Sequence, residues 1–299
     1  MTEVMKMKNM EYMKKRCLYP LLFLLTGMFA ACQEDDLSSR SVIDDEVKRN
    51  AFDEWLLKNY VNPYNIDFKY RMEDIETDYT KNLVPADFDL SVKLAKIVKH
   101  LWLEAYDECG GVDFTRKNVP KVIHVIGSAS WNQGSFTLGV AENGIKVTLY
   151  LGNWLDPTNT AQLNEYYFHT MHHEFSHILH QTREYPQEYN LISAASYSPT
   201  GWINRTLADA APLGFVTPYA SSEPVEDIAE ITSCYLTYTD AEWNEVWAAA
   251  GAGGRAMIEQ KISIMKKYMK DTWNIDMDRL RDCIARRGNE IKELDLEHV

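Results

Sequence analysis

The chain has 299 residues, of which 45% are hydrophobic and 25% charged, and this composition is typical of a globular protein rather than a disordered one. It carries 31 Lys and Arg residues against 44 Asp and Glu residues, so its formal net charge is −13. A chain this acidic repels phosphate backbones, and we expect no nucleic acid among its partners.

The first 31 residues have the order of a secretory signal peptide. Basic residues between positions 6 and 16 come first, the apolar run 18–31 follows, and Cys32 comes directly after it. The apolar run is shorter than the roughly 20 residues that a membrane-spanning helix needs. The pattern therefore predicts a cleaved export signal over residues 1–31.

The residues before the expected cleavage site resemble a bacterial lipobox. Phe29-Ala30-Ala31-Cys32 places two small residues before a cysteine, and the resemblance implies that Cys32 is lipidated and becomes the N-terminus. Acyl chains would hold the protein at a membrane, so we expect an outer-membrane lipoprotein, periplasmic or surface-exposed. The acidic residues after Cys32 favour the surface, and residues 32–45 are predicted to be a polar tether.

Three of the five cysteines, Cys109, Cys234 and Cys283, lie in the body of the chain. Their spacings match no metal or redox motif. A disulfide between two of them is compatible with export, but buried free thiols are the preferred interpretation.

The first elements alternate between helix and strand. Apolar residues at helical spacing predict a helix over 45–60, which Pro63 would end, and alternation predicts a strand over 64–72. A long amphipathic helix is expected from Pro85 to about 109, where Gly110-Gly111 would stop it.

A small sheet and a long helix follow. Apolar, β-rich runs predict strands over 121–126, 135–141 and 145–151. The turn at Asn143-Gly144 favours a hairpin between the last two strands. Signals between Asp156 and Thr160 then predict the start of a helix that runs to about residue 181.

The rest of the chain is predicted to be loop-rich as far as Pro224 and helical after it. Further helices are expected over 223–238, 240–250, 254–271 and 276–293. The predicted fold class is therefore α+β, mostly helical, with a small β-sheet. One domain would span 46–299, with an upper half to about 182 and a C-terminal helical half, 183–299.

The predicted helix that ends near residue 181 contains the pattern H-E-x-x-H at His173, Glu174 and His177. Residues four apart face the same side of a helix, so both imidazoles can bind one zinc ion. Glu174 lies beside the first ligand and could act as general base on a zinc-bound water.

A catalytic zinc site needs a third protein ligand. His180 lies about 10.5 Å along the helix axis from His173 at the helical rise, too far to share the ion. We expect His180, His169 and His172 to be packed or solvated instead.

The remaining candidates for the third ligand are two glutamates on a later helix. Glu226 and Glu230 lie four apart and face one side, so one can bind zinc while the other accepts the free N–H of a ligand histidine. Glu223 and Asp227, by contrast, are explained by acidic residues complementing the dipole at a helix start.

Two resemblances assign roles within this set. The segments His173-Glu-Phe-Ser-His177 and Tyr219-x6-Glu226-Asp-Ile-Ala-Glu230 are similar to the zinc sites of the anthrax lethal factor-like gluzincins. That resemblance implies a zincin-like metalloprotease fold with an H-E-x-x-H active-site helix. It makes Glu226 the third ligand and Tyr219 the group that stabilises the oxyanion, which leaves Glu230 as the outer partner.

Nearly the whole mature chain also resembles the substrate import-associated zinc metallohydrolase lipoproteins. The matching segments include Asn62-Pro-Tyr-Asn-Ile66, His172–Gln181 and Gly214-Phe-Val-Thr-Pro-Tyr-Ala220. The resemblance implies a zinc-dependent metallopeptidase that acts on peptides or proteins and serves nutrient acquisition beside an outer-membrane import receptor.

Two alternatives stay open. The chain could be a non-catalytic substrate-binding lipoprotein of the uptake system, with Trp131, Trp154 and Trp202 stacking on sugars, although core packing is the commoner role of such residues. It could also hydrolyse a non-peptide amide, since the same zinc, base and oxyanion donor serve any amide.

Overall fold

The structure, a computed structural model, describes residues 48–73, 80–132, 135–137, 139–142 and 145–299, without the side chains of 132–144. From Arg49 onward these residues belong to one compact unit, Arg49–Val299. The expected signal peptide, the lipidation site Cys32, the whole tether and the turn Asn143-Gly144 lie outside the described residues. No helix within the described part of the chain is long and apolar enough to cross a membrane.

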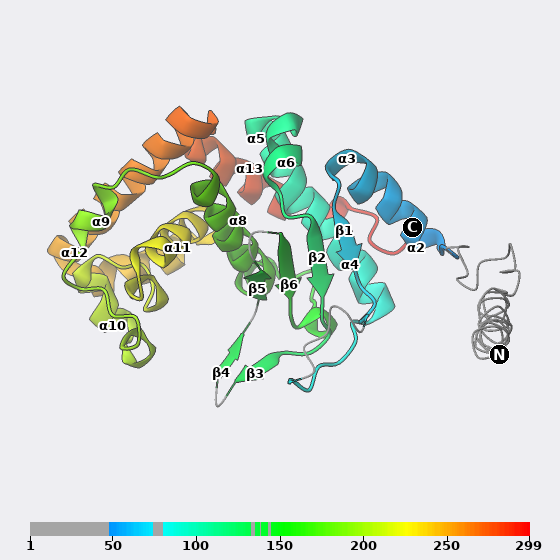
Figure 1. The fold of residues 1–299 in the computed structure, drawn as a ribbon, viewed down its shortest axis with the longest axis horizontal. Helices are drawn as coiled ribbons and strands as arrows, with labels where there is room; N and C mark the ends of the chain where they lie inside the picture. The colour runs from blue at the N-terminus through cyan, green and yellow to red at the C-terminus, as the bar shows by residue number, and fades with distance from the viewer. Residues whose placement is uncertain (1–47, 74–79, 133–134, 138, 143–144) are drawn as a thin grey trace, which may run out of the picture. The chain divides into compact units, whose positions relative to one another are not determined.

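A four-stranded sheet with the order β1-β2-β6-β5 stands in the N-terminal half (Figure 1). Its strands are β1 (Asp67–Lys69), β2 (Val122–Val125), β6 (Lys146–Leu149) and β5 (Gly139–Glu142). The first three run parallel, and β5 lies antiparallel to β6 at the edge. Gly139 is opposite Leu149 and Glu142 is opposite Lys146, which confirms the predicted hairpin.

The strand predicted over 135–141 is wrong as a single element. Its first half, β4 (Ser135–Thr137), pairs antiparallel with β3 (Ser130–Asn132) in a separate two-stranded sheet, and its second half is β5. The two halves form their backbone hydrogen bonds with different partners, which apolar alternation along one segment cannot reveal.

The first helix begins later and ends later than predicted. It runs as α2 (Ala51–Leu56), a π turn η1 (Leu57–Val61) and α3 (Asn62–Tyr64), straight through Pro63. Asn50 starts it at Ala51 because its side chain accepts the Asp53 N–H while the Asp53 carboxylate accepts the Asn50 N–H. Asn65, in a left-handed conformation (φ 55°), ends it.

The long helix predicted from Pro85 begins instead at Phe88, where Asp87 caps it. It runs as α4 (Phe88–Val98), η3 (Lys99–Leu103) and α5 (Glu104–Gly110). It ends as predicted, because Gly111 takes a positive φ of 87°. Pro85 instead forms an isolated bridge with Ile126, and a helix that was not predicted, α6 (Val112–Asn118), follows Gly111.

Two helices that carry the candidate site lie side by side, α8 (His169–Thr182) and α11 (Pro224–Thr237) (Figure 1). A helical lead-in of α7 (Thr160–Leu163) and η5 (Asn164–Phe168) precedes α8, and Asn159 caps it. The edge strand β5 contacts α8. Short turns fill the loop-rich segment: α9 (Tyr189–Ile192), η6 (Trp202–Asn204), α10 (Leu207–Ala210), η7 (Ala211–Leu213) and η8 (Tyr219–Ser221).

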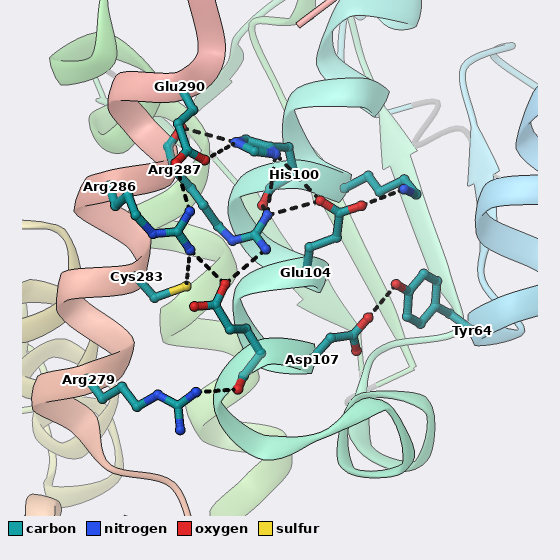
Figure 2. A network of polar contacts seen from close by, with 11 residues as sticks. Tyr64, His100, Glu104, Asp107, Arg279, Cys283, Arg286, Arg287 and Glu290 are labelled. Carbon is teal, nitrogen blue, oxygen red and sulfur yellow. Dashed lines mark hydrogen bonds and ion pairs between the residues drawn. The ribbon is translucent and has the colours of Figure 1, made fainter. Parts of the chain in front are cut away.

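The C-terminal half is helical, as predicted. The two helices expected over 240–250 and 254–271 form α12 (Asp240–Trp273), which bends at Gly251, whose φ is 60°. Then come α13 (Met277–Glu290) and η9 (Ile291–Glu293), and α13 joins α5 through the polar network in Figure 2. The expected α+β class, mostly helical with a small sheet, is confirmed.

The three cysteines of the body are free thiols. Cys234 and Cys283 are buried, which confirms the preferred interpretation for these two residues, whereas Cys109 is only half-buried.

Candidate metal centre

The helix α8 separates an apolar face from a histidine face. Met171, Phe175 and Leu179 follow one another every four residues and are at most 2% exposed. This face packs into the core, where the Phe175 ring meets Trp102 edge-on at 5.4 Å. Burial of that stripe fixes the rotation of the helix, so His173 and His177 face the opposite side, towards α11.

Three ligand atoms meet between α8 and α11. The Nε2 atoms of His173 and His177 lie 3.1 Å apart, and Oε2 of Glu226 lies 3.0 Å from the first and 3.2 Å from the second. These three residues form a group that could hold a metal ion. The sequence-predicted ligand set is thus brought together at one point.

The spacing of this triangle fits zinc. Zinc binds nitrogen and oxygen at about 2.0–2.2 Å in a tetrahedral arrangement, which separates two ligand atoms by about 3.3 Å. The observed edges of 3.0–3.2 Å come close to one face of such a tetrahedron. Two imidazole nitrogens and one carboxylate oxygen are also the donor types that catalytic zinc uses, with the fourth position left for water.

Electrostatics around the triangle favour a cation. Burial alone would lower the pKa of His173, but its hydrogen bonds with Glu226 and Glu230 outweigh burial and raise that pKa to about 10. Burial likewise opposes the charge on Glu226, yet its hydrogen bonds with the two histidines hold the pKa of this carboxyl well below its usual value. The carboxylates therefore stabilise positive charge at this point.

Glu230 joins several groups behind the triangle. Its Oε1 lies 2.8 Å from His173 Nδ1 and 2.9 Å from His169 Nε2, and its Oε2 accepts the Thr217 hydroxyl at 2.5 Å. His169, Glu230 and Cys234 form a second group of ligand-type atoms. Glu230, however, already contacts His173 and accepts from Thr217. The sequence indicated Glu230 as the outer partner of a ligand histidine. The contact of His169 with Glu230 could have been found from the spacing of four residues between His169 and His173, whereas no sequence pattern indicated Thr217.

The remaining histidines of α8 do not join the triangle. His180 lies instead with its Nε2 2.9 Å from Nδ1 of His177, and burial together with His177 lowers its pKa to about 4. His172 faces the core, where the Tyr106 hydroxyl is 3.0 Å from its Nδ1, and burial lowers its pKa to about 3. Both side chains are therefore neutral near pH 7.

Tyr219 and Glu174 lie beside the triangle. The Tyr219 ring stacks on His173 at 5.8 Å and meets Trp202 edge-on at 4.8 Å. Burial, followed by the charge of Glu226, raises the pKa of Tyr219, so its hydroxyl stays protonated and can donate. Glu174 is half-buried, and its charge contributes to raising the pKa of both His173 and Tyr219, which puts its carboxylate in electrostatic range of them.

A buried ion pair adjoins the third candidate ligand. Asp227 was expected only to complement the dipole at the helix start. It is fully buried, and its Oδ2 accepts from Lys261 of α12 at 2.5 Å and from the Tyr197 hydroxyl at 2.8 Å. The Lys261 ammonium also lies 4.3 Å from the centre of the Phe215 ring. The pair ties the start of α11 to α12, a link between distant residues that the sequence did not indicate.

Comparisons with known proteins identify the family of the chain. Residues 45–278 match a family model described as "Putative zinc-binding metallo-peptidase". The chain is 68% identical to a protein of that description from Bacteroides caccae ATCC 43185, whose crystal structure matches with a TM-score of 0.76, over 83% of this chain and 95% of the other. A search of curated proteins found no match.

Proposed function

Given that the chain belongs to the zinc-binding metallo-peptidase family whose model spans residues 45–278, we propose that it is a zinc-dependent peptidase of the gluzincin type with a zincin-like fold. Zinc is its cofactor. We assign the metal to His173, His177 and Glu226, general-base catalysis to Glu174, oxyanion stabilisation to Tyr219, and the outer carboxylate to Glu230.

The observation that carries the proposal is the ligand triangle. Three ligand-type atoms from two helices approach one another to within 3.0–3.2 Å, close to one face of a zinc tetrahedron. The proposed base and oxyanion donor lie next to the same point, as a hydrolytic site requires.

When bound, zinc supplies a Lewis acid that polarises the scissile carbonyl and lowers the pKa of a water molecule towards about 7. The Glu174 carboxylate takes a proton from the attacking water and delivers it to the leaving amine. The Tyr219 hydroxyl, kept protonated by its surroundings, donates to the oxyanion that develops on the carbonyl.

An extended peptide would pair with β5. This strand lies at the edge of the sheet and contacts α8, the helix that carries H-E-x-x-H. A substrate strand added there would bring its backbone carbonyls past the zinc ligands.

We further propose that residues 1–31 direct export and that Cys32 carries the lipid anchor of an outer-membrane lipoprotein, with the surface favoured over the periplasm. Such a peptidase would supply an import receptor with cleaved nutrients. The support for this part is the sequence pattern and its family resemblance.

An accessory binding lipoprotein remains the second candidate function. Core packing, the commoner role expected of its tryptophans, is wrong for Trp131 and Trp154, which are 65% and 63% exposed. Stacking of an exposed aromatic ring on a sugar is the interaction that this candidate function would use. Trp202 is half-buried against Tyr219 instead.

Purified protein incubated with a peptide library, with and without zinc, tests the proposal. Wild type should cleave only with zinc, and Glu174→Gln should retain zinc while losing about 10²–10⁴-fold in turnover. Glu245→Gln, an exposed position on α12, is the matched control and should behave as wild type. Undiminished cleavage by Glu174→Gln would refute the base assignment.

A glycan-binding assay and a set of non-peptide amides separate the alternatives. Glycan binding without hydrolysis would favour the accessory lipoprotein, and cleavage confined to the amides would move the enzyme to that substrate class.

A further inference from the structure

Both ring nitrogens of His177 have a partner. Its Nε2 belongs to the ligand triangle, and its Nδ1 lies 2.9 Å from Nε2 of His180, one helical turn further along α8. The two rings meet edge-on, with centroids 5.2 Å apart and planes at 71°.

Metal binding fixes where the protons of this pair lie. A neutral imidazole carries one proton, so a His177 whose Nε2 lone pair binds zinc has its proton on Nδ1. That N–H can donate only to a lone pair, and the atom facing it is His180 Nε2. His180 therefore has to be neutral, with its own proton on Nδ1.

The two imidazole ligands thus differ in their outer partners. His173 Nδ1 faces a carboxylate oxygen of Glu230 at 2.8 Å, whereas His177 Nδ1 faces a neutral ring. A neutral acceptor orients the ligand without adding a second negative charge behind the site. Outer partners of this kind fix the tautomer and the ring orientation of a metal-binding histidine.

His180 is itself held in place. Its ring packs edge-on against Tyr185 at 5.7 Å, and the Tyr185 hydroxyl donates to Asn190 Oδ1 at 2.9 Å. Tyr185 is only 8% exposed, so the wall behind His180 belongs to the packed interior.

We propose that His180 is a positioning residue of the zinc site, whose Nε2 accepts the Nδ1–H of His177 and so holds that ligand in the tautomer and orientation that bind the metal. The inference rests on the proposed function, because it requires His177 to be a zinc ligand.

Zinc affinity measured by competition with a chelating indicator tests this role without an activity assay. His180→Leu should bind zinc about 10–100-fold more weakly, the effect typical of losing an outer partner. His180→Gln should recover most of the affinity, because its amide oxygen can accept from His177 near the position of the lost Nε2. Gln181→Leu, an exposed change next along the same helix, is the matched control and should match wild type.

A spectroscopic readout checks the tautomer directly. In zinc-loaded wild type, the ¹⁵N signals of His177 should report a protonated Nδ1 and a metal-bound Nε2, and this pattern should weaken in His180→Leu but return in His180→Gln. Melting temperatures of the zinc-free variants show whether each has folded.

The possible outcomes are distinct. The inference would be overturned if folded His180→Leu bound zinc as tightly as wild type. It would also be overturned if folded His180→Gln bound zinc no more tightly than His180→Leu. Either result would leave the assignment of the zinc ligands intact. If wild type is folded but takes up no zinc, the proposed function itself is contradicted.

Discussion

Two regions of this molecule are rich in ionisable side chains, and they are organised in opposite ways. Between α8 and α11, two imidazole nitrogens and a carboxylate oxygen converge on one point. Between α5 and α13, two arginines instead meet three glutamates of opposite charge (Figure 2). Arg287 bonds Glu104 at 3.0 Å and Glu108 at 3.1 Å, and Arg286 bonds Glu108 at 2.6 Å and Glu290 at 2.7 Å.

This difference in organisation distinguishes a candidate metal site from a network of ion pairs that supports the fold. Most guanidinium donors and carboxylate acceptors in the α5–α13 network bond to one another, so the charges of Arg286, Arg287, Glu104 and Glu108 are balanced within it. The atoms of the ligand triangle are all potential electron-pair donors to a metal, and a cation at their centre satisfies them together. Residue type alone does not distinguish the two regions, but the pairing of donors and acceptors does.

The largest effect is expected from breaking the buried ion pair of Lys261 and Asp227, which lies next to the metal centre. Lys261→Met removes the ammonium that meets Asp227 at full burial and leaves a charge without its partner. We expect unfolding to become easier by about 3–5 kcal/mol, measured by urea denaturation. Hydrolysis per folded molecule should stay within a few-fold of wild type, because this pair supports the fold.

A paired variant controls that prediction. Lys261→Met combined with Asp227→Asn removes both charges, so it should recover part of the stability that Lys261→Met loses. If Lys261→Met were as stable as wild type, the pair would not anchor α11 to α12.

The next largest effect is expected from removing one hydroxyl group beside the ligand triangle. Tyr219→Phe keeps the ring that stacks on His173 but loses the hydroxyl. Turnover should fall about 10²–10³-fold, with zinc content and melting temperature unchanged, as measured by steady-state kinetics and metal analysis. Full activity would exclude Tyr219 as oxyanion donor.

A smaller effect comes from the α5–α13 network. Arg287 is 14% exposed and bridges two glutamates, so Arg287→Ala should cost about 1–2 kcal/mol of stability. Changing Arg286, which is 48% exposed, to alanine should cost less stability than changing Arg287. Neither change should alter zinc affinity, and a loss of zinc from folded Arg287→Ala would contradict the separation of the two regions.

The smallest effect is a pH dependence of the same network. Hydrogen bonding from His100 outweighs burial and, with Lys99 and Arg287, lowers the pKa of Glu104 to about 2. A depressed pKa contributes stability above its ordinary value of 4.5, and this contribution is lost as pH falls towards 2. Glu104→Gln should therefore be less stable than wild type above pH 4.5, and the gap should close on acidification; a gap independent of pH would be inconsistent with this.

Local patterns were enough to predict much of the site. H-E-x-x-H defines its own geometry, because residues four apart share a helix face, and the same spacing relates Glu226 to Glu230. Both helices lie where the apolar periodicity indicated, and α11 begins at Pro224 as predicted. The predicted ligands, base and oxyanion donor accordingly lie together.

Features that depend on distant partners were missed. Thr217, which donates to Glu230, and Lys261, which meets Asp227, are joined to their partners only by the fold. The segment 135–141 split for the same reason, since its two halves pair with different strands. His180 was not predicted to be a ligand, and spacing alone did not reveal its contact with His177.

The most direct test of the ligand set is a crystal structure of zinc-loaded protein with anomalous data collected on both sides of the zinc absorption edge. The account predicts one peak at about 2.0–2.2 Å from Nε2 of His173, Nε2 of His177 and a carboxylate oxygen of Glu226. A peak held by other residues, or no zinc in a crystal grown with the metal, would contradict it.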